Sequence, residues 1–142
     1  MRWMWTHAWV ALWIALLGTA TYAEEHVAVI VHPSRTVTLS RAEVARMYLK
    51  KQRFWDDGAP IVVINRESGS GARELFSERV LGSDSMRLAA YWNEQYFQGI
   101  FPPATLSSGA AVKKFVASEP NAIGYIDAAE VDDSVRVILP LP

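Results

Sequence analysis

The sequence predicts an α/β domain in which a central, mainly parallel β-sheet is flanked by helices. Two observations predict this fold class. Continuous apolar runs at 27–31, 61–64 and 122–126 are typical of strands buried on both faces. Segments with apolar residues at helical spacing separate these runs, and alternating strands and helices favour a sheet covered by helices. The length of 142 residues is enough for one domain of ordinary size.

Residues 1–23 have the features of a secretory signal peptide. Arg2 gives a positive start, and the apolar stretch at 9–17 is too short to span a bilayer comfortably. Thr21 and Ala23 are small residues at the two positions that a signal peptidase inspects. We expect cleavage after Ala23, which leaves 24–142 as an exported, periplasmic domain. The alternative is an uncleaved N-terminal anchor, and mass spectrometry of the exported protein separates the two.

The strand at 27–31 is expected to end before Pro33, because proline cannot donate to a β-ladder. The first helix is expected to begin at Ser40, since Glu43 stands three residues later and completes a capping box. A loop follows at 50–60, and the strand at 61–64 comes after it.

The C-terminal half predicts two helices and two strands. A helix is expected at 86–98, with Ala89, Trp92, Tyr96 and Phe97 on one side, and we interpret its aromatic residues as core. Another helix is expected to open at 107–109, where we interpret the serines as an N-cap. Further strands are expected at 122–126 and 135–139.

The functional hypothesis rests on the loop at 65–73, between the strand at 61–64 and a helix at 74–81. Glycine lets a backbone approach a ligand closely, and the first turn of a helix has free N–H groups that favour an anion. Hydroxyl and guanidinium groups add further donors. We expect the loop to hold a small oxyanion, above all phosphate. The expected ligands are Arg66, Ser68, Gly69, Ser70, Gly71, Ala72 and Arg73. An ordinary helix cap and turn is the alternative.

Four segments, taken in order, resemble the phosphate-binding proteins of ABC transporters, which have the type 2 periplasmic binding fold. They are the strand at 27–31 with the helix start at 39–43, the Trp-Asp-Asp-Gly turn at 55–58, Arg-Glu-Ser-Gly-Ser-Gly at 66–71, and Pro-Asn-Ala-Ile-Gly-Tyr at 120–125. Together they cover nearly all of the expected mature chain. The resemblance implies one lobe of such a protein, with binding and no catalysis.

The resemblance also implies roles for single residues. Arg66 corresponds to the arginine that contacts phosphate, and Ser70 and Gly71 to the serine and amide that cradle it. Two positions depart from the pattern. Ala72 replaces a frequent threonine, and Ser68 replaces an aspartate that accepts a proton from phosphate in some members and so discriminates against sulfate.

Members of this family have two lobes that close on the ligand, and the present sequence resembles the second lobe alone. A site with one lobe leaves the anion partly in water, where each charge-assisted bond is screened. We therefore expect weaker binding than in a two-lobed relative unless a partner or a second copy covers the site.

Other function classes fit less well. The formal net charge of −1 gives no electrostatic footprint for nucleic acid, and the absence of cysteine excludes disulfides and thiolate metal sites. A hydrolase elbow, G-x-S-x-G, would need glycine at Ser68, and no Gly-Lys-Ser/Thr follows for a P-loop. His26 with Glu24 and Glu25 is more typical of a solvated terminus than of a metal site. We expect no cofactor and no enzymatic activity.

The preferred prediction is an exported binding protein for phosphate or a similar oxyanion, serving ABC transporter membrane subunits. The alternative is a periplasmic interaction module that uses the lobe as a scaffold for a sensor, a transporter subunit or self-association. Exposed aromatic residues on an uncovered face would favour the alternative. The candidates for such a surface are Phe54, Trp55, Tyr91 and Phe101.

Overall fold

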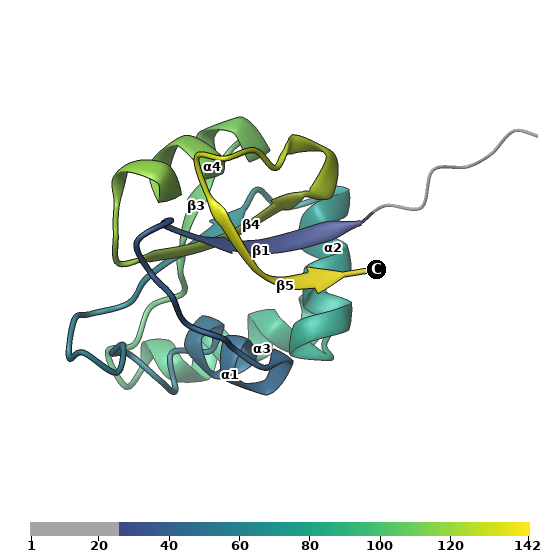
Figure 1. Cartoon of the computed structure of the whole chain (residues 1–142). Helices are drawn as coiled ribbons and strands as arrows, with labels where there is room; N and C mark the ends of the chain where they lie inside the picture. Colours follow the sequence, from purple (N-terminus) through teal and green to yellow (C-terminus); the bar gives the residue numbers. More distant parts are fainter. Residues whose placement is uncertain (1–25) are drawn as a thin grey trace, which may run out of the picture.

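The computed structural model describes residues 26–142, which form a five-stranded sheet with helices on both faces (Figure 1). The expected leader at 1–23, with Glu24 and Glu25, lies outside the described residues. The strands are β1 (Val27–Val31), β2 (Val62–Arg66), β3 (Ala104–Leu106), β4 (Ala122–Asp127) and β5 (Arg136–Leu141). The helices are α1 (Arg41–Tyr48), α2 (Gly71–Phe76), the π-helical η1 (Ser77–Leu81), α3 (Ser85–Tyr96), α4 (Gly109–Ser118) and the 3₁₀ turn η2 (Ala128–Glu130).

The sheet has the strand order β3-β2-β4-β1-β5. Strand β2 is parallel to β3 and β4, whereas β1 is antiparallel to both of its neighbours, β4 and β5. Four strands therefore point the same way and β1 alone is reversed. The expected α/β fold is confirmed, but because β1 lies inside the sheet, half of the strand pairings are antiparallel.

Strand β1 explains why its sequence is an unbroken apolar run. Val27, Val29 and Val31 belong to a core cluster formed with α1, α2 and η1, whereas Ala28 and Ile30 belong to a second cluster under α4. Figure 1 shows α4 on one side of the sheet and α1 and α3 on the other. With helices on both faces, alternate side chains of the strand are equally buried.

Helix α1 begins as expected from its capping box. The Ser40 hydroxyl accepts a hydrogen bond from the Glu43 amide at 3.2 Å, and the Glu43 carboxylate accepts one from the Ser40 amide at 2.7 Å. These contacts, led by the bond to the Ser40 backbone, lower the pKa of Glu43.

Replacing Ser40 with alanine should lower the free energy of unfolding by about 1 kcal/mol, because an orphan amide of the first turn loses its acceptor. Urea denaturation followed by circular dichroism measures the change. Thr38→Ala is the matched control, since Thr38 is exposed and outside the cap. An equal effect of the two substitutions would contradict the role of the cap.

Helix α3 differs most from the sequence-based expectation. It forms at Ser85–Tyr96, but none of its residues is buried, and Phe97 at its C-terminus is 85% exposed. The interpretation of its aromatic residues as core is therefore wrong. Helical spacing shows only that one side is apolar, and within the described chain no other element covers that side of α3 fully.

Smaller differences concern short elements. Strand β3, a three-residue edge strand after Pro102 and Pro103, was not expected from the sequence. The helix after the central loop changes to π-helical geometry at Ser77, and the last strand runs to Leu141. Ser108 caps α4 as expected, since its hydroxyl accepts the amide of Ala111 at 3.0 Å.

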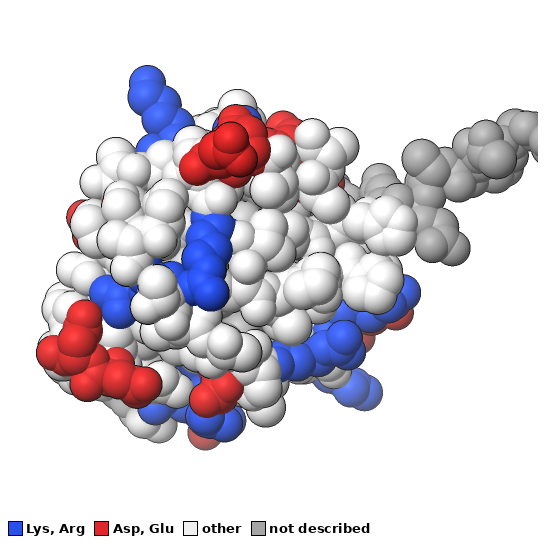
Figure 2. Space-filling model, viewed as in Figure 1, with Lys and Arg blue, Asp and Glu red and all other residues white. Residues whose placement is uncertain are grey.

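Within residues 26–142, no helix is both long and apolar enough to cross a membrane. On the face seen in Figure 2, Lys and Arg side chains alternate with acidic groups and uncharged surface instead of joining in one basic patch.

Candidate functional site

The loop between β2 and α2 has the predicted strand–turn–helix geometry. Strand β2 ends at Arg66, Gly69 has a φ of +84°, and Ser70 is the N-cap of α2. The positive φ suits glycine, which has no Cβ to clash. The Ser70 hydroxyl accepts the Arg73 amide at 3.1 Å. In the described part of the chain, the amides of Gly71 and Ala72 donate no hydrogen bond to another protein group, as expected for the first turn of a helix.

Arg66 is only 7% exposed, and its guanidinium already faces acids. Its Nε and Nη2 donate to the two carboxylate oxygens of Glu67 at 2.9 and 3.1 Å. Its Nη1 lies 3.8 Å from Asp127 Oδ2, is buried, and has no hydrogen-bond acceptor among residues 26–142. The hydrogen bond from Arg66 lowers the pKa of Glu67, so this carboxylate is ionised at neutral pH. An incoming anion would therefore compete with Glu67 for this arginine.

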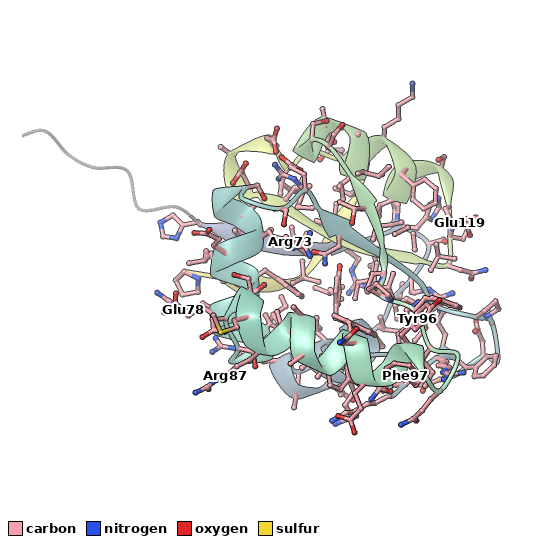
Figure 3. The ribbon with its side chains drawn as sticks, turned by 180° about the vertical axis from the view of Figure 1, so that it is seen from behind. Arg73, Glu78, Arg87, Tyr96, Phe97 and Glu119 are labelled. Carbon is pink, nitrogen blue, oxygen red and sulfur yellow. The ribbon has the colours of Figure 1, made fainter. Side chains whose placement is uncertain are left out.

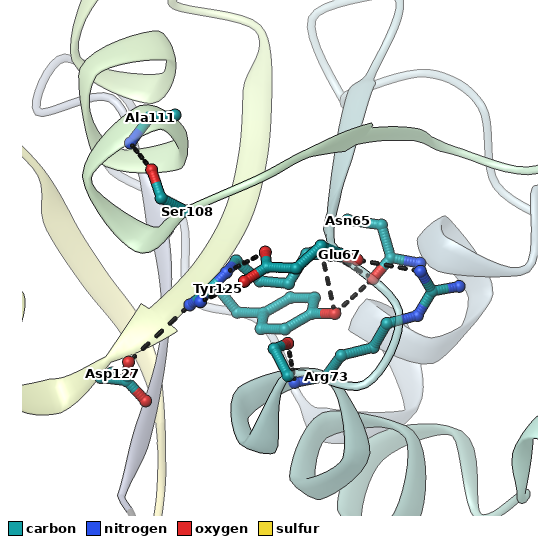
Figure 4. A network of polar contacts seen from close by, with 9 residues as sticks. Asn65, Glu67, Arg73, Ser108, Ala111, Tyr125 and Asp127 are labelled. Atoms are coloured by element: carbon teal, nitrogen blue, oxygen red, sulfur yellow. Dashed lines mark hydrogen bonds and ion pairs between the residues drawn. The ribbon is translucent and has the colours of Figure 1, made fainter.

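A second cluster of hydrogen-bonded polar residues connects β2 to β4 (Figure 4). The Tyr125 hydroxyl donates to Asn65 Oδ1, which also accepts the Arg66 amide at 3.0 Å. Burial raises the pKa of Tyr125 to about 12, so its hydroxyl remains a donor at neutral pH. Asn65 Oδ1 accepts hydrogen bonds from both of these donors. The Asn65 side-chain NH₂ therefore points away from them and can donate to another group.

Arg73, labelled in Figure 4, extends from the first turn of α2 toward the end of β2. Its Nη1 donates to the Arg66 carbonyl at 2.9 Å, which anchors the side chain across the turn. Figure 3 shows Arg73 near the middle of the molecule, between α2 and the sheet.

A pocket of about 690 Å³ opens beside Arg73, between α3 and the sheet. Of the seven residues expected to bind an oxyanion, Ser68, Gly69 and Arg73 line this pocket. The other four do not line it. The predicted residues therefore do not form one site: three line the pocket, Arg66 lies beside Asp127, and Ser70, Gly71 and Ala72 form the start of α2.

Sequence reasoning missed several residues of the pocket wall. Asn65 contributes at the polar end, and Leu88, Trp92, Pro102 and Pro103 contribute apolar surface. In the sequence, the apolar side of α3 is the signal for this wall, but the same pattern also predicts a core-facing helix. Within the described residues, no cluster of His, Cys, Asp and Glu is placed to hold a metal ion.

Comparison with known proteins identifies the family to which the chain belongs. Residues 19–137 match the family model described as a PBP superfamily domain. The chain belongs to the PBP superfamily. The resemblance noted in the sequence is thereby confirmed at the level of the family.

Solved structures of the same fold agree with this PBP superfamily assignment. A putative phosphate ABC transporter substrate-binding protein with bound phosphate from Clostridium perfringens is 30% identical, with a TM-score of 0.64, over 80% of this chain and 45% of that chain. An ABC-type phosphate transport receptor from Vibrio cholerae is 24% identical, with the same TM-score and coverage. PstS from Borrelia burgdorferi is 19% identical, with a TM-score of 0.61, over 80% of this chain and 47% of that chain. The last two show the fold alone, and the chain spans less than half the length of all three.

Proposed function

We propose that this PBP superfamily domain binds a small oxyanion, first of all phosphate, at the loop between β2 and α2. The observation that carries the proposal is the buried Nη1 of Arg66, which has no acceptor among the described residues. A buried donor without an acceptor costs free energy, and a charged oxygen would supply the acceptor. The phosphate-bound relative, 30% identical over 80% of this chain, supports phosphate as the first ion to test.

The proposed roles follow from the donors of the loop. Arg66 supplies positive charge, and the amides of Gly69, Gly71 and Ala72 supply neutral donors. Two serines, Ser68 and Ser70, offer hydroxyls. The Ser70 oxygen already accepts the Arg73 amide, which leaves its hydroxyl proton for a ligand. Arg73 lines the pocket, which Arg66 does not, so it would supply a cation to an anion bound on the pocket side of the loop.

Calorimetric titration of the exported protein with phosphate and with sulfate tests the proposal. Phosphate should bind, and Arg66→Ala should weaken its affinity about tenfold or more, because a hydrogen bond to a charged group is lost. Arg87→Ala on the exposed surface of α3 is the matched control and should leave the affinity unchanged. No heat with either ion at millimolar concentration would contradict the proposal.

Replacing Glu67 with glutamine should tighten phosphate binding roughly two- to fivefold, because a partly exposed ion pair of this kind is worth roughly 0.2–1 kcal/mol. The substitution removes the negative charge that pairs with the Arg66 guanidinium through two hydrogen bonds. Since the pKa of Glu67 is lowered from its ordinary value, the wild-type carboxylate competes throughout the neutral range, and acidification below that pKa should mimic the variant. Calorimetry measures the affinity, with Glu94→Gln as the control because Glu94 is exposed on α3 and does not line the pocket. Unchanged or weaker binding in Glu67→Gln would show that Glu67 does not compete.

We further propose that the domain is exported through the expected leader at 1–23 and acts in the periplasm beside ABC transporter membrane subunits. The phosphate transport systems named for two of the solved structures support this setting.

A second candidate function is favoured by one observation. Tyr96, Phe97 and Phe101 form an exposed aromatic cluster at the C-terminal end of α3, with ring centroids 6.0 and 5.7 Å from Tyr96. Of the four aromatic residues considered from sequence, Phe54 and Phe101 are exposed and Tyr91 is half-buried, but Trp55 is buried under the Arg35 guanidinium. The cluster would suit an interaction module that contacts a sensor, a transporter subunit or a second copy. Co-purification from the native envelope, lost in Phe97→Ala, would support this function.

A further inference from the structure

The pocket beside Arg73 is larger than an inorganic oxyanion requires. Its volume of about 690 Å³ lies within the range of roughly 300–1,000 Å³ that is usual for sites of organic ligands. A phosphate ion held at Ser68, Gly69 and Arg73 would fill only a small part of it. The remaining volume would suit a ligand that carries an organic group, here called its body, on the phosphate.

The pocket lining includes hydrogen-bond donors from β2, from the loop that follows it and from α2. They are the Asn65 side-chain NH₂, the Ser68 hydroxyl, and the part of the Arg73 guanidinium that does not bond to the Arg66 carbonyl. Among the described residues none of these donors has a protein acceptor. Both lone-pair positions of Asn65 Oδ1 are taken by Tyr125 and the Arg66 amide, which fixes the orientation of the Asn65 amide.

Another part of the lining is apolar. Leu88 and Trp92 contribute it from α3, and Pro102 and Pro103 contribute it from the segment that leads into β3. Trp92 is half-buried in a helix that buries no residue, so one part of its ring is available to a ligand. Proline and tryptophan offer flat apolar surfaces that suit an aromatic or aliphatic group.

Acids restrict the charge of the ligand body. Three acids, Glu74, Glu78 and Asp84, also line the pocket, and all are exposed, so they lie where the pocket meets solvent. A second negative group on the ligand would be repelled there. The arrangement suits one anionic head and an uncharged body.

We propose that the pocket binds an organic phosphate monoester, with its phosphate at Asn65, Ser68 and Arg73 and its apolar body against Trp92 and the two prolines. This inference rests on the proposed function through Ser68, Gly69 and Arg73, the part of the proposed oxyanion site that lines the pocket, and not through Arg66. It extends that function from a free ion to a class of substituted phosphates.

Titration calorimetry of the exported protein with three probes tests the inference: inorganic phosphate, methyl phosphate and phenyl phosphate. Methyl and phenyl phosphate share the monoester head and differ in the body. Phenyl phosphate should bind at least about tenfold more tightly than methyl phosphate, because the phenyl ring buries apolar surface that a methyl group cannot.

Three variants locate the effect. Trp92→Ala should bring the ratio of the two affinities close to one, because the apolar wall is lost. Ala89→Phe should do the same by filling the pocket from an exposed helical position, where the fold tolerates a larger side chain. Phe97→Ala is the matched control and should keep the wild-type ratio, since Phe97 lies outside the pocket and is 85% exposed.

The outcomes separate the inference from the proposed function. Equal affinities for methyl and phenyl phosphate, with phosphate still bound, would overturn the inference and leave the proposed function standing. Binding of phenol as tight as that of phenyl phosphate would overturn the assignment of a phosphate head. No heat with any of the phosphates would overturn the proposed function, and the inference with it.

Discussion

Replacing Phe76 with alanine should lower the free energy of unfolding by about 3 to 5 kcal/mol, the largest effect of a single substitution that we expect in this domain. Phe76 is 1% exposed and stacks on the Tyr125 ring, with centroids 4.0 Å apart and planes 1° apart. It also contacts Tyr48 at 4.5 Å between centroids. The alanine variant would lose this contact area and leave a cavity between α2 and the sheet.

Urea denaturation with circular dichroism measures the effect of Phe76→Ala. Phe97→Ala is the matched control, because it removes the same atoms from an exposed position and should change the stability by less than about 0.5 kcal/mol. Similar losses in the two variants would mean that the aromatic stack does not anchor α2. Because Tyr125 contacts both Phe76 and Asn65, phosphate binding should weaken in Phe76→Ala at temperatures where the variant is still folded.

Replacing Gly124 with alanine should lower the free energy of unfolding by about 1 to 3 kcal/mol, because the new methyl group overpacks the contact between β4 and α4. A Cβ at this position would lie 2.7 Å from Val112 Cγ1 and 3.2 Å from Val116 Cγ2. Both valines are on a helix, where their rotamers are restricted, so they cannot turn aside freely. The strand and helix would have to separate.

A compensating variant tests this explanation of Gly124. The double variant Gly124→Ala/Val112→Ala should be more stable than the sum of the two single losses predicts, because alanine at 112 removes the Cγ atom that clashes. Denaturation curves of the four proteins give the coupling free energy. Strict additivity would show that the loss in Gly124→Ala has another cause.

Features that depend on a few neighbouring residues were predictable from the sequence. The capping box of Ser40 and Glu43 and the N-cap Ser108 appear as expected. A strand, a turn and a helix follow one another around 65–73 as expected, although α2 begins at Gly71 and not at 74. Each is decided by hydrogen bonds between residues close in the chain. The buried β1 was likewise predictable, since its apolar run fits only a strand covered on both faces.

The candidate site was predictable only as a stretch of sequence. The residue types at 65–73 indicate which hydrogen-bond donors the loop has, but not the directions in which these donors point. Arg66 pairs with its neighbour Glu67, and Asp127 reaches it because β4 lies beside β2 in the sheet. Trp92 and Pro103 line the pocket together with residues of the loop. The sequence around 65–73 contains no signal that predicts these two neighbours.

The sequence by itself determined the α/β class, the starts of α1 and α4, and the donor-rich loop after β2. Only the tertiary structure decided that β1 is reversed inside the sheet, that α3 remains exposed, and that Arg73 lines the pocket whereas Arg66 lies beside Asp127. The physical reason is one of range. Caps, turns and periodic burial depend on interactions over a few residues, whereas the partner of a buried charge and the cover of an apolar helix depend on which distant segments pack together.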